Sequence, residues 1–142
     1  MADASTDDFQ AVFWETKHDM VRASTAAFSQ HGVHEGQQYV LMALWETDGL
    51  TPGEVAKRLG IATPTVTRTT ARMAAAGLLR REPHPGDRRL VRLTLTEKGR
   101  ALEETIGLEM QQLNERALAG MSAAERAALI EALRKVQANL SH

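Results

Sequence analysis

Cysteine is missing from the 142 residues of this chain. Its absence excludes disulfide bridges, thiolate nucleophiles, cysteine-ligated zinc and thiol-based redox sensing. No apolar run approaches the roughly 18 residues of a membrane-spanning helix, and the start MADASTDDF carries acids where a targeting peptide carries bases. We therefore expect a soluble protein of the cytoplasm that does not associate with a membrane.

Motifs for catalysis and for metal binding are missing as well. The sequence has no glycine-rich phosphate-binding loop and no Ser/His/Asp arrangement, so we expect no enzymatic activity. His31, His34 and Glu35 lie close together, but they fall where a predicted helix ends and their spacing is poorly fixed. We expect these histidines to be solvated, and we expect no metal ion or other cofactor.

A strong charge of one sign is also absent, because the formal net charge is −1. This average hides an asymmetry: residues 57–100 hold eleven Lys and Arg against three acids, a balance of +8, whereas the remainder holds six against fifteen, or −9. The charge pattern predicts one surface suited to a polyanion. With 43% hydrophobic and 25% charged residues, the composition is that of a globular protein, and the length predicts one domain over residues 1–142.

Apolar residues recur at helical spacing in the first half of the chain. A long amphipathic helix is predicted over residues 8–30, and a second apolar stripe over residues 37–45 predicts another. The segment TPGE at 51–54 combines an N-cap, a proline and a capping-box glutamate, which predicts a short third helix that Gly60 closes in the left-handed conformation. A tight turn follows, so a helix-turn-helix is expected here.

The fourth predicted helix carries the residues that suggest a function. It starts with a threonine cap at Thr63 and a following proline, and Gly77 ends it. Thr65, Arg68 and Arg72 stand at i, i+3 and i+7, so they share one outward stripe without an acid. Further threonines flank this stripe: Thr63, Thr67 and Thr69. Arginine pairs with guanine acceptors and threonine contacts phosphate or a thymine methyl, so the stripe predicts major-groove reading.

After this helix the apolar period changes to two. Two strands with a turn-forming loop between them are predicted: 79–82 and 91–95, with the loop at 83–89. A hairpin directly after a helix-turn-helix is a wing, and its basic end offers Arg88 and Arg89 to a minor groove. Asp87 is predicted to orient Arg89 through a bidentate contact.

Two further helices are predicted after the wing, each opened by capping residues: Thr96 for the first, and Ser122 with Glu125 for the last. The compact region 35–95 can cover only part of the apolar stripes on the terminal helices, so we expect burial against a second copy in a homodimer. The expected fold is mainly α with a small β-hairpin wing. Residues 8–30 and 96–140 are its expected dimerisation helices.

The ordered motifs of one long segment carry a family resemblance. The segment LTPGEVAKRLGIATPTVTRTTARMAAAGLLRREPHPGDRRLVRLTLTEKGRAL contains a T-V-T-R helix, a G-L terminus, a D-R-R wing and an L-T-x-K-G entry into the next helix. Over about residues 35–102 the chain resembles the MarR-type (multiple antibiotic resistance regulator) winged helix-turn-helix proteins. The resemblance implies a triangular homodimer that binds a pseudo-palindromic operator in double-stranded DNA.

The resemblance also implies roles for single residues. Thr65, Thr67, Arg68 and Arg72 would enter the major groove, and Arg89 would enter the minor groove with support from Asp87 and with Arg88 as a second candidate there. The usual family role is repression relieved by a small, often aromatic anion, although some members activate. The alternative is a winged helix used only for protein interaction or dimerisation, without DNA binding.

An effector pocket is expected near the junction of the first, second and fifth helices. Its candidate residues offer aromatic rings, a base and a histidine that suit a phenolic carboxylate: Trp14, His18, Arg22, Tyr39, Met42 and Trp45. Aromatic residues at helical spacing are more often core than pocket, so the alternative is that these side chains only pack.

Overall fold

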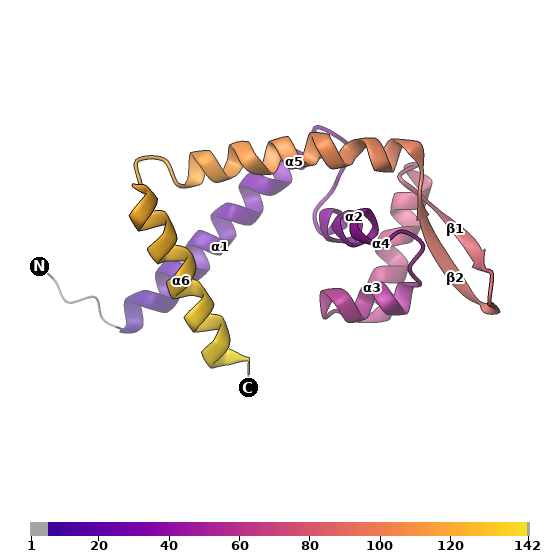
Figure 1. The fold of residues 1–142 in the computed structure, drawn as a ribbon, viewed down its shortest axis with the longest axis horizontal. Helices are drawn as coiled ribbons and strands as arrows, with labels where there is room; N and C mark the ends of the chain where they lie inside the picture. The colour runs from indigo at the N-terminus through magenta and orange to yellow at the C-terminus, as the bar shows by residue number, and fades with distance from the viewer. Residues whose placement is uncertain (1–5, 142) are drawn as a thin grey trace, which may run out of the picture. The chain divides into compact units, whose positions relative to one another are not determined.

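The computed structural model describes residues 6–141, so residues 1–5 of the acidic start MADASTDDF lie outside the described part. Figure 1 labels its elements in chain order, and their bounds are α1 (Thr6–Ser29), α2 (Gln37–Glu46), α3 (Pro52–Leu59), α4 (Thr63–Ala75), β1 (Leu79–His84), β2 (Asp87–Leu95), α5 (Glu97–Ala117) and α6 (Ala123–Leu140). The expected fold class, mainly helical with a small β-hairpin, is confirmed. No helix in this part has the length and apolarity that a membrane crossing requires.

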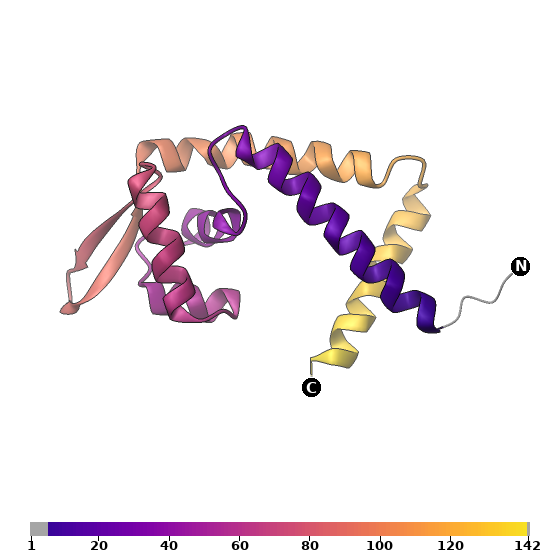
Figure 2. The same ribbon diagram turned by 180° about the vertical axis from the view of Figure 1, so that it is seen from behind.

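Residue contacts divide the chain into two compact units, one up to Glu109 and the other from Met110. In the first unit, α2, α3 and α4 lie together on one side of the hairpin (Figure 1, Figure 2). Fully buried apolar side chains from these helices, the hairpin and the first part of α5 form its core: Leu41, Leu44, Val55, Val66, Met73, Leu78, Leu79, Leu93 and Ile106. The core therefore supports the helix-turn-helix and the wing together.

Local signals in the sequence set the ends of α3. Thr51 accepts a hydrogen bond from the Glu54 backbone N–H at 3.1 Å, and the Glu54 carboxylate accepts one from the Thr51 N–H at 3.2 Å. This capping box satisfies two amide groups that the helix leaves unpaired. Gly60 ends the helix with a φ of 66°, a conformation that favours glycine. The predicted cap and terminator of this helix are confirmed.

The predicted start of α4 is wrong by one residue. Ala62 is the N-cap, in extended conformation and without a side-chain cap bond, and Thr63 and Pro64 are the first two helical residues. Proline is favourable there because the first turn leaves its amides unpaired in any case. The other end follows the prediction: Gly77 has a φ of 79°, and the next amide, of Leu78, donates to the Met73 carbonyl at 3.0 Å.

The hairpin is longer, and its turn shorter, than predicted. β1 and β2 pair antiparallel from Leu79 opposite Leu95 up to His84 opposite Asp87, with an irregularity at Pro83 and His84. The predicted loop over 83–89 is therefore wrong, because only the turn at 85–86 separates the strands. Proline is tolerated here because a two-stranded sheet has only edge strands, which need fewer amide donors.

The second unit contains the end of α5 and α6. Ser122 and Glu125 form the predicted capping box at the start of α6, with both hydrogen bonds at 3.1 Å. Arg126 donates to the carbonyls of Leu118 and Met121, at 3.1 and 3.2 Å, which ties α6 to the turn before it. α6 buries none of its residues within this chain.

Candidate nucleic-acid interface

The two faces of α4 differ in chemistry. Val66, Thr70 and Met73 are fully buried and fix the helix against the core. On the opposite face Arg68 and Arg72 are exposed. No acid occurs in the first turn of this helix. The face is therefore cationic and accessible, as contact with a polyanion requires.

The threonines of α4 differ in what their hydroxyl groups can still do. Thr67 is half-buried, and its hydroxyl donates to the Thr63 carbonyl at 3.1 Å, so its oxygen is left as an acceptor. Thr70 is fully buried, and its hydroxyl donates to the Val66 carbonyl at 2.8 Å. Thr65 is half-buried and Thr63 is exposed. The predicted stripe is thus present on one helix, with a spine of buried residues behind it.

The wing carries the predicted bidentate contact between Asp87 and Arg89. The guanidinium Nε and NH2 groups of Arg89 donate to the two carboxylate oxygens at 3.1 and 3.0 Å, and the Arg89 backbone N–H donates to Oδ1 at 3.0 Å. These bonds lower the pKa of Asp87 and raise that of Arg89. The Arg89 side chain is still 89% exposed. Asp87, Arg88 and Arg89 lie at the start of β2 rather than in the predicted loop.

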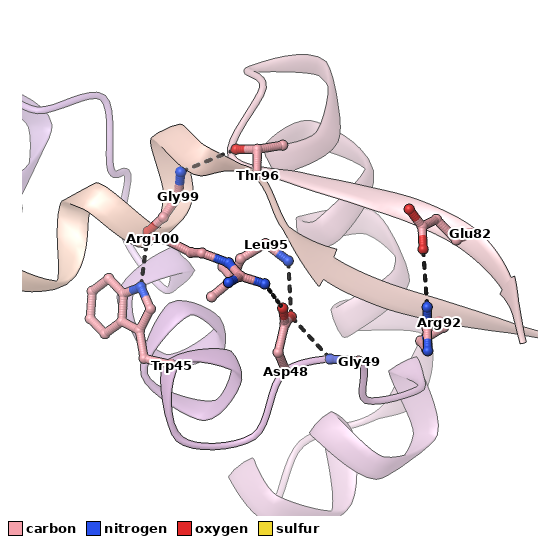
Figure 3. Close-up of polar contacts among 9 residues, drawn as sticks. All are labelled: Trp45, Asp48, Gly49, Glu82, Arg92, Leu95, Thr96, Gly99 and Arg100. Atoms are coloured by element: carbon pink, nitrogen blue, oxygen red, sulfur yellow. Dashed lines mark hydrogen bonds and ion pairs between the residues drawn. The ribbon is translucent and has the colours of Figure 1, made fainter.

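Asp48 forms hydrogen bonds at the base of the wing, a role that was not predicted from the sequence (Figure 3). Its carboxylate Oδ1 accepts from the Leu95 N–H at 2.9 Å and from the Gly49 N–H at 3.0 Å, and Oδ2 pairs with Arg100 at 2.9 Å. The only local signal is the Asp-Gly pair of a turn. Its partners Leu95 and Arg100 are distant in sequence, so periodicity and spacing cannot reveal them.

The start of α5 is tied to the end of α4. Thr96 caps α5 as predicted, by accepting from the Gly99 N–H at 3.1 Å, and its hydroxyl donates to the Gly77 carbonyl at 2.6 Å. Lys98 donates to the Ala76 carbonyl at 3.2 Å. A side chain at Gly99 would overlap the carbonyl oxygen of Leu78, so glycine is required at this position. The T-x-K-G motif therefore joins the two helices closely.

The six effector candidates differ in exposure and in their contacts. Tyr39 lines a cleft of about 330 Å³ together with Lys17, Met20, Val21, Ser24 and Thr25 of α1. Trp14, His18, Arg22 and Met42 are exposed, and Arg22 pairs with Asp19 at 3.4 Å. Trp45 is half-buried and donates from its ring nitrogen to the Gly99 carbonyl at 2.9 Å (Figure 3).

The histidines near the end of α1 make contacts within the protein. His31 lies 3.0 Å from a carboxylate oxygen of Glu109, and the His34 backbone N–H donates to the Gln37 side chain at 3.0 Å. Among residues 6–141, no group of three His, Cys, Asp or Glu side chains is placed to hold a metal ion.

Known proteins are similar to this chain in sequence and in fold. The MarR family model matches residues 31–90. The HTH-type transcriptional regulator TtmR of Methylorubrum extorquens is 31% identical over 140 residues, which span 97% of this chain and 71% of the relative. The HTH-type transcriptional repressor NicR of Pseudomonas putida is 32% identical over 100 residues, which span 70% of this chain and 63% of the relative.

A solved structure of a protein–DNA complex is also similar. The crystal structure of a mutant MarR from E. coli, complexed with operator DNA, has a TM-score of 0.81 and 26% identity, over 91% of this chain and 93% of that chain. This similarity covers most of the fold, and the 31% identity to the regulator of Methylorubrum extends over nearly the whole chain. The chain therefore belongs to the MarR family, whose members are DNA-binding winged helix-turn-helix regulators of transcription and not enzymes.

Proposed function

We propose that this protein is a homodimeric, ligand-responsive repressor that binds a pseudo-palindromic operator in duplex DNA. One observation carries the proposal: α4 presents an acid-free face of threonine and arginine, and its opposite face is locked into the core. Such a helix reads base edges without moving relative to its domain. Because its proposed partner is duplex DNA, we place the protein in the cytoplasm.

The predicted contact residues of α4 and of the wing each have a role in this proposal. Arg68 contacts a guanine in the major groove, and Arg72 contacts base or phosphate further along α4. The threonines give shorter contacts to phosphate or to a thymine methyl: Thr63, Thr65 and Thr67. Arg89 enters the minor groove in the orientation that Asp87 holds, and Arg88 lies next to it.

A second copy of the chain is the proposed partner of the terminal helices. α6 keeps an apolar stripe at helical spacing exposed, with Leu129 at 39%, Ile130 at 46%, Leu133 at 39% and Leu140 at 78% exposure. On α1, Phe9 and Val12 are also exposed. A folded monomer rarely leaves so much apolar surface in water. Each copy would supply one reading head, which consists of α4 and the wing, so that a dimer contacts both half-sites of a palindrome.

Repression and response to a ligand complete the proposal. The repressor name of the Pseudomonas relative supports the direction of regulation. For the effector we favour the cleft between α1 and α2, where Tyr39 supplies a ring and Lys17 a cation. This pair suits a small aromatic carboxylate. Calorimetry with a panel of aromatic acids tests the ligand separately from the DNA.

Selection of bound sites from random duplex DNA tests the proposed function. The full chain is mixed with the random pool, the bound duplexes are recovered, and the cycle is repeated. We expect an inverted repeat whose half-site centres lie about 10 base pairs apart or a multiple of that. Recovery of unrelated sequences, or of no duplex, would contradict operator binding and would favour a winged helix that contacts only proteins.

A further inference from the structure

We propose that Asp48 is a positioning residue for DNA binding, because it sets the angle of the wing relative to the recognition helix α4. This inference rests on the proposed function and adds a residue that does not itself touch DNA. Asp48 lies in the exposed turn that follows α2, whereas its main partners belong to the wing and to α5.

The contacts of Asp48 join three parts of the fold (Figure 3). One carboxylate oxygen holds the N–H of Leu95, the last residue of β2, and the other pairs with Arg100 in the first turn of α5. The same carboxylate accepts from the Gly49 N–H within its own turn. Hydrogen bonds to a charged acceptor are about twice as strong as neutral ones, so the carboxylate is suited to fixing these parts together.

The next residues extend this attachment along the wing. The Gly49 N–H donates to the Leu93 carbonyl at 3.0 Å, and the Leu93 N–H donates to the Leu50 carbonyl at 2.8 Å. Gly49 has a φ of 82°, which favours glycine, and the Arg92 side chain lies against it. Arg92 in turn pairs with Glu82 of β1 at 3.3 Å. The segment 48–50 therefore bonds β2 directly at Leu93 and Leu95, and it is linked to β1 through Arg92 and Glu82.

The geometry of the hairpin amplifies any change at this end. Asp87 and Leu95 are the first and last residues of β2. Eight steps of about 3.3 Å separate them by about 26 Å, so a rotation of about 10° at the base moves the tip by about 5 Å. Hydrogen-bond lengths vary over only about 0.5 Å. Arg89 therefore reaches its groove only when the base holds the correct angle.

If the charge of Asp48 alone mattered, this residue would weaken DNA binding instead of supporting it. The residue lies beside a cationic, DNA-reading region, where a carboxylate repels phosphate. Removal of this charge would then strengthen DNA binding. If Asp48 positions the wing, removal of its carboxylate instead weakens DNA binding, and it does so only when the wing itself contacts DNA. The two explanations therefore predict changes in DNA affinity of opposite sign.

A double-mutant cycle with Asp48→Ala and Arg89→Ala tests the inference. Affinity for the selected operator is measured by fluorescence anisotropy for the full-length wild type, both single variants and the double variant. We expect Asp48→Ala to lower affinity about tenfold in the wild-type background and less than about twofold with Arg89→Ala, because residues of one network are not additive. Asp48→Asn, which keeps an acceptor for Leu95, should recover part of the loss.

Glu46→Ala is the matched control, because it removes the charge of an exposed acid at the end of α2. We expect it to leave operator affinity unchanged or slightly raised. If Asp48→Ala fails to fold in thermal melts, the Asp48→Asn variant takes its place in the cycle. Equal losses in both backgrounds, or a gain in affinity, would overturn the positioning role. Failure of the wild type to bind any selected duplex would overturn the proposed function, and this inference with it.

Discussion

Arg68 and Arg72 are exposed on a helix whose other face is buried in the core, and under the proposed function this combination gives single residues a large effect on DNA binding. The exposed face was predictable from the sequence, because i, i+3 and i+7 spacing follows from helix geometry. The internal bond of Thr67 to Thr63 was not, because spacing alone does not tell whether a hydroxyl turns back to its own helix.

The first prediction concerns Arg68. Arg68→Ala should weaken specific operator binding by about 1 to 3 kcal/mol, or about 5- to 150-fold, because a bidentate contact to guanine carries about that much discrimination. Titration of the selected operator and of a scrambled duplex measures the change. Arg22→Ala, which removes an exposed arginine of α1, is the control and should leave affinity for both duplexes unchanged. Unchanged binding by Arg68→Ala would remove Arg68 from the reading face.

The second prediction concerns the pH range of the Asp87 and Arg89 pair. Hydrogen bonds from Arg89 lower the pKa of Asp87 below the ordinary aspartate value of 3.8. Because the pKa of Asp87 is lower in the folded than in the unfolded state, its contribution to the free energy of unfolding is fully present above pH 3.8. That contribution is lost as the pH falls through the lower pKa of the folded state. In a His84→Gln background, which removes the histidine opposite Asp87, the ¹H–¹⁵N signal of the Arg89 amide should therefore stay constant from about pH 7 to about pH 5. Asp87→Asn should shift this signal at every pH, and a titration step near neutral pH would contradict the assignment.

Helices and strands were predictable where their ends depend on neighbouring residues. The capping boxes at Thr51 and Ser122 and the left-handed Gly60 follow from residues that lie within a few positions. The wing was harder, because its Pro-Gly turn and adjacent basic residues are typical of a loop. Pairing between the strands overrides these local preferences and extends β1 to His84. Asp48 could not be found at all, because its key partners come from β2 and α5.

The third prediction compares two threonines at helix starts. Thr51→Ala should lower the free energy of unfolding by about 1 kcal/mol, because it removes the cap of α3. Thr63→Ala should change it by less than about 0.5 kcal/mol, because Thr63 is exposed in the first turn of α4 and does not cap it. Chemical denaturation of both variants measures the difference. An equal loss of unfolding free energy in both variants would show that Thr63 caps α4, as its sequence position predicts.

At the scale of the whole molecule, the exposed stripe of α6 is the surface on which the proposed dimer depends. α6 buries no residue within its own chain, yet its apolar residues recur on one side of the helix. An isolated helix with such a stripe gains little stability by itself, since helices of this length depend on packing. Burial against a second chain would supply that packing and would fix the separation between the two heads.

The fourth prediction is that Leu133→Glu dissociates the dimer and halves the salt dependence of its DNA affinity. A charge on the stripe would have to be buried without a partner, so sedimentation should detect a monomer. Each phosphate that the protein neutralises contributes about 0.9 to the slope of log affinity against log salt. A monomer carries one head, so its slope should be about half that of the wild type. Ala138→Glu adds the same charge on the other side of α6 and should leave both quantities unchanged. A monomeric wild type, or an unchanged slope in a monomeric Leu133→Glu, would contradict the paired reading of two half-sites.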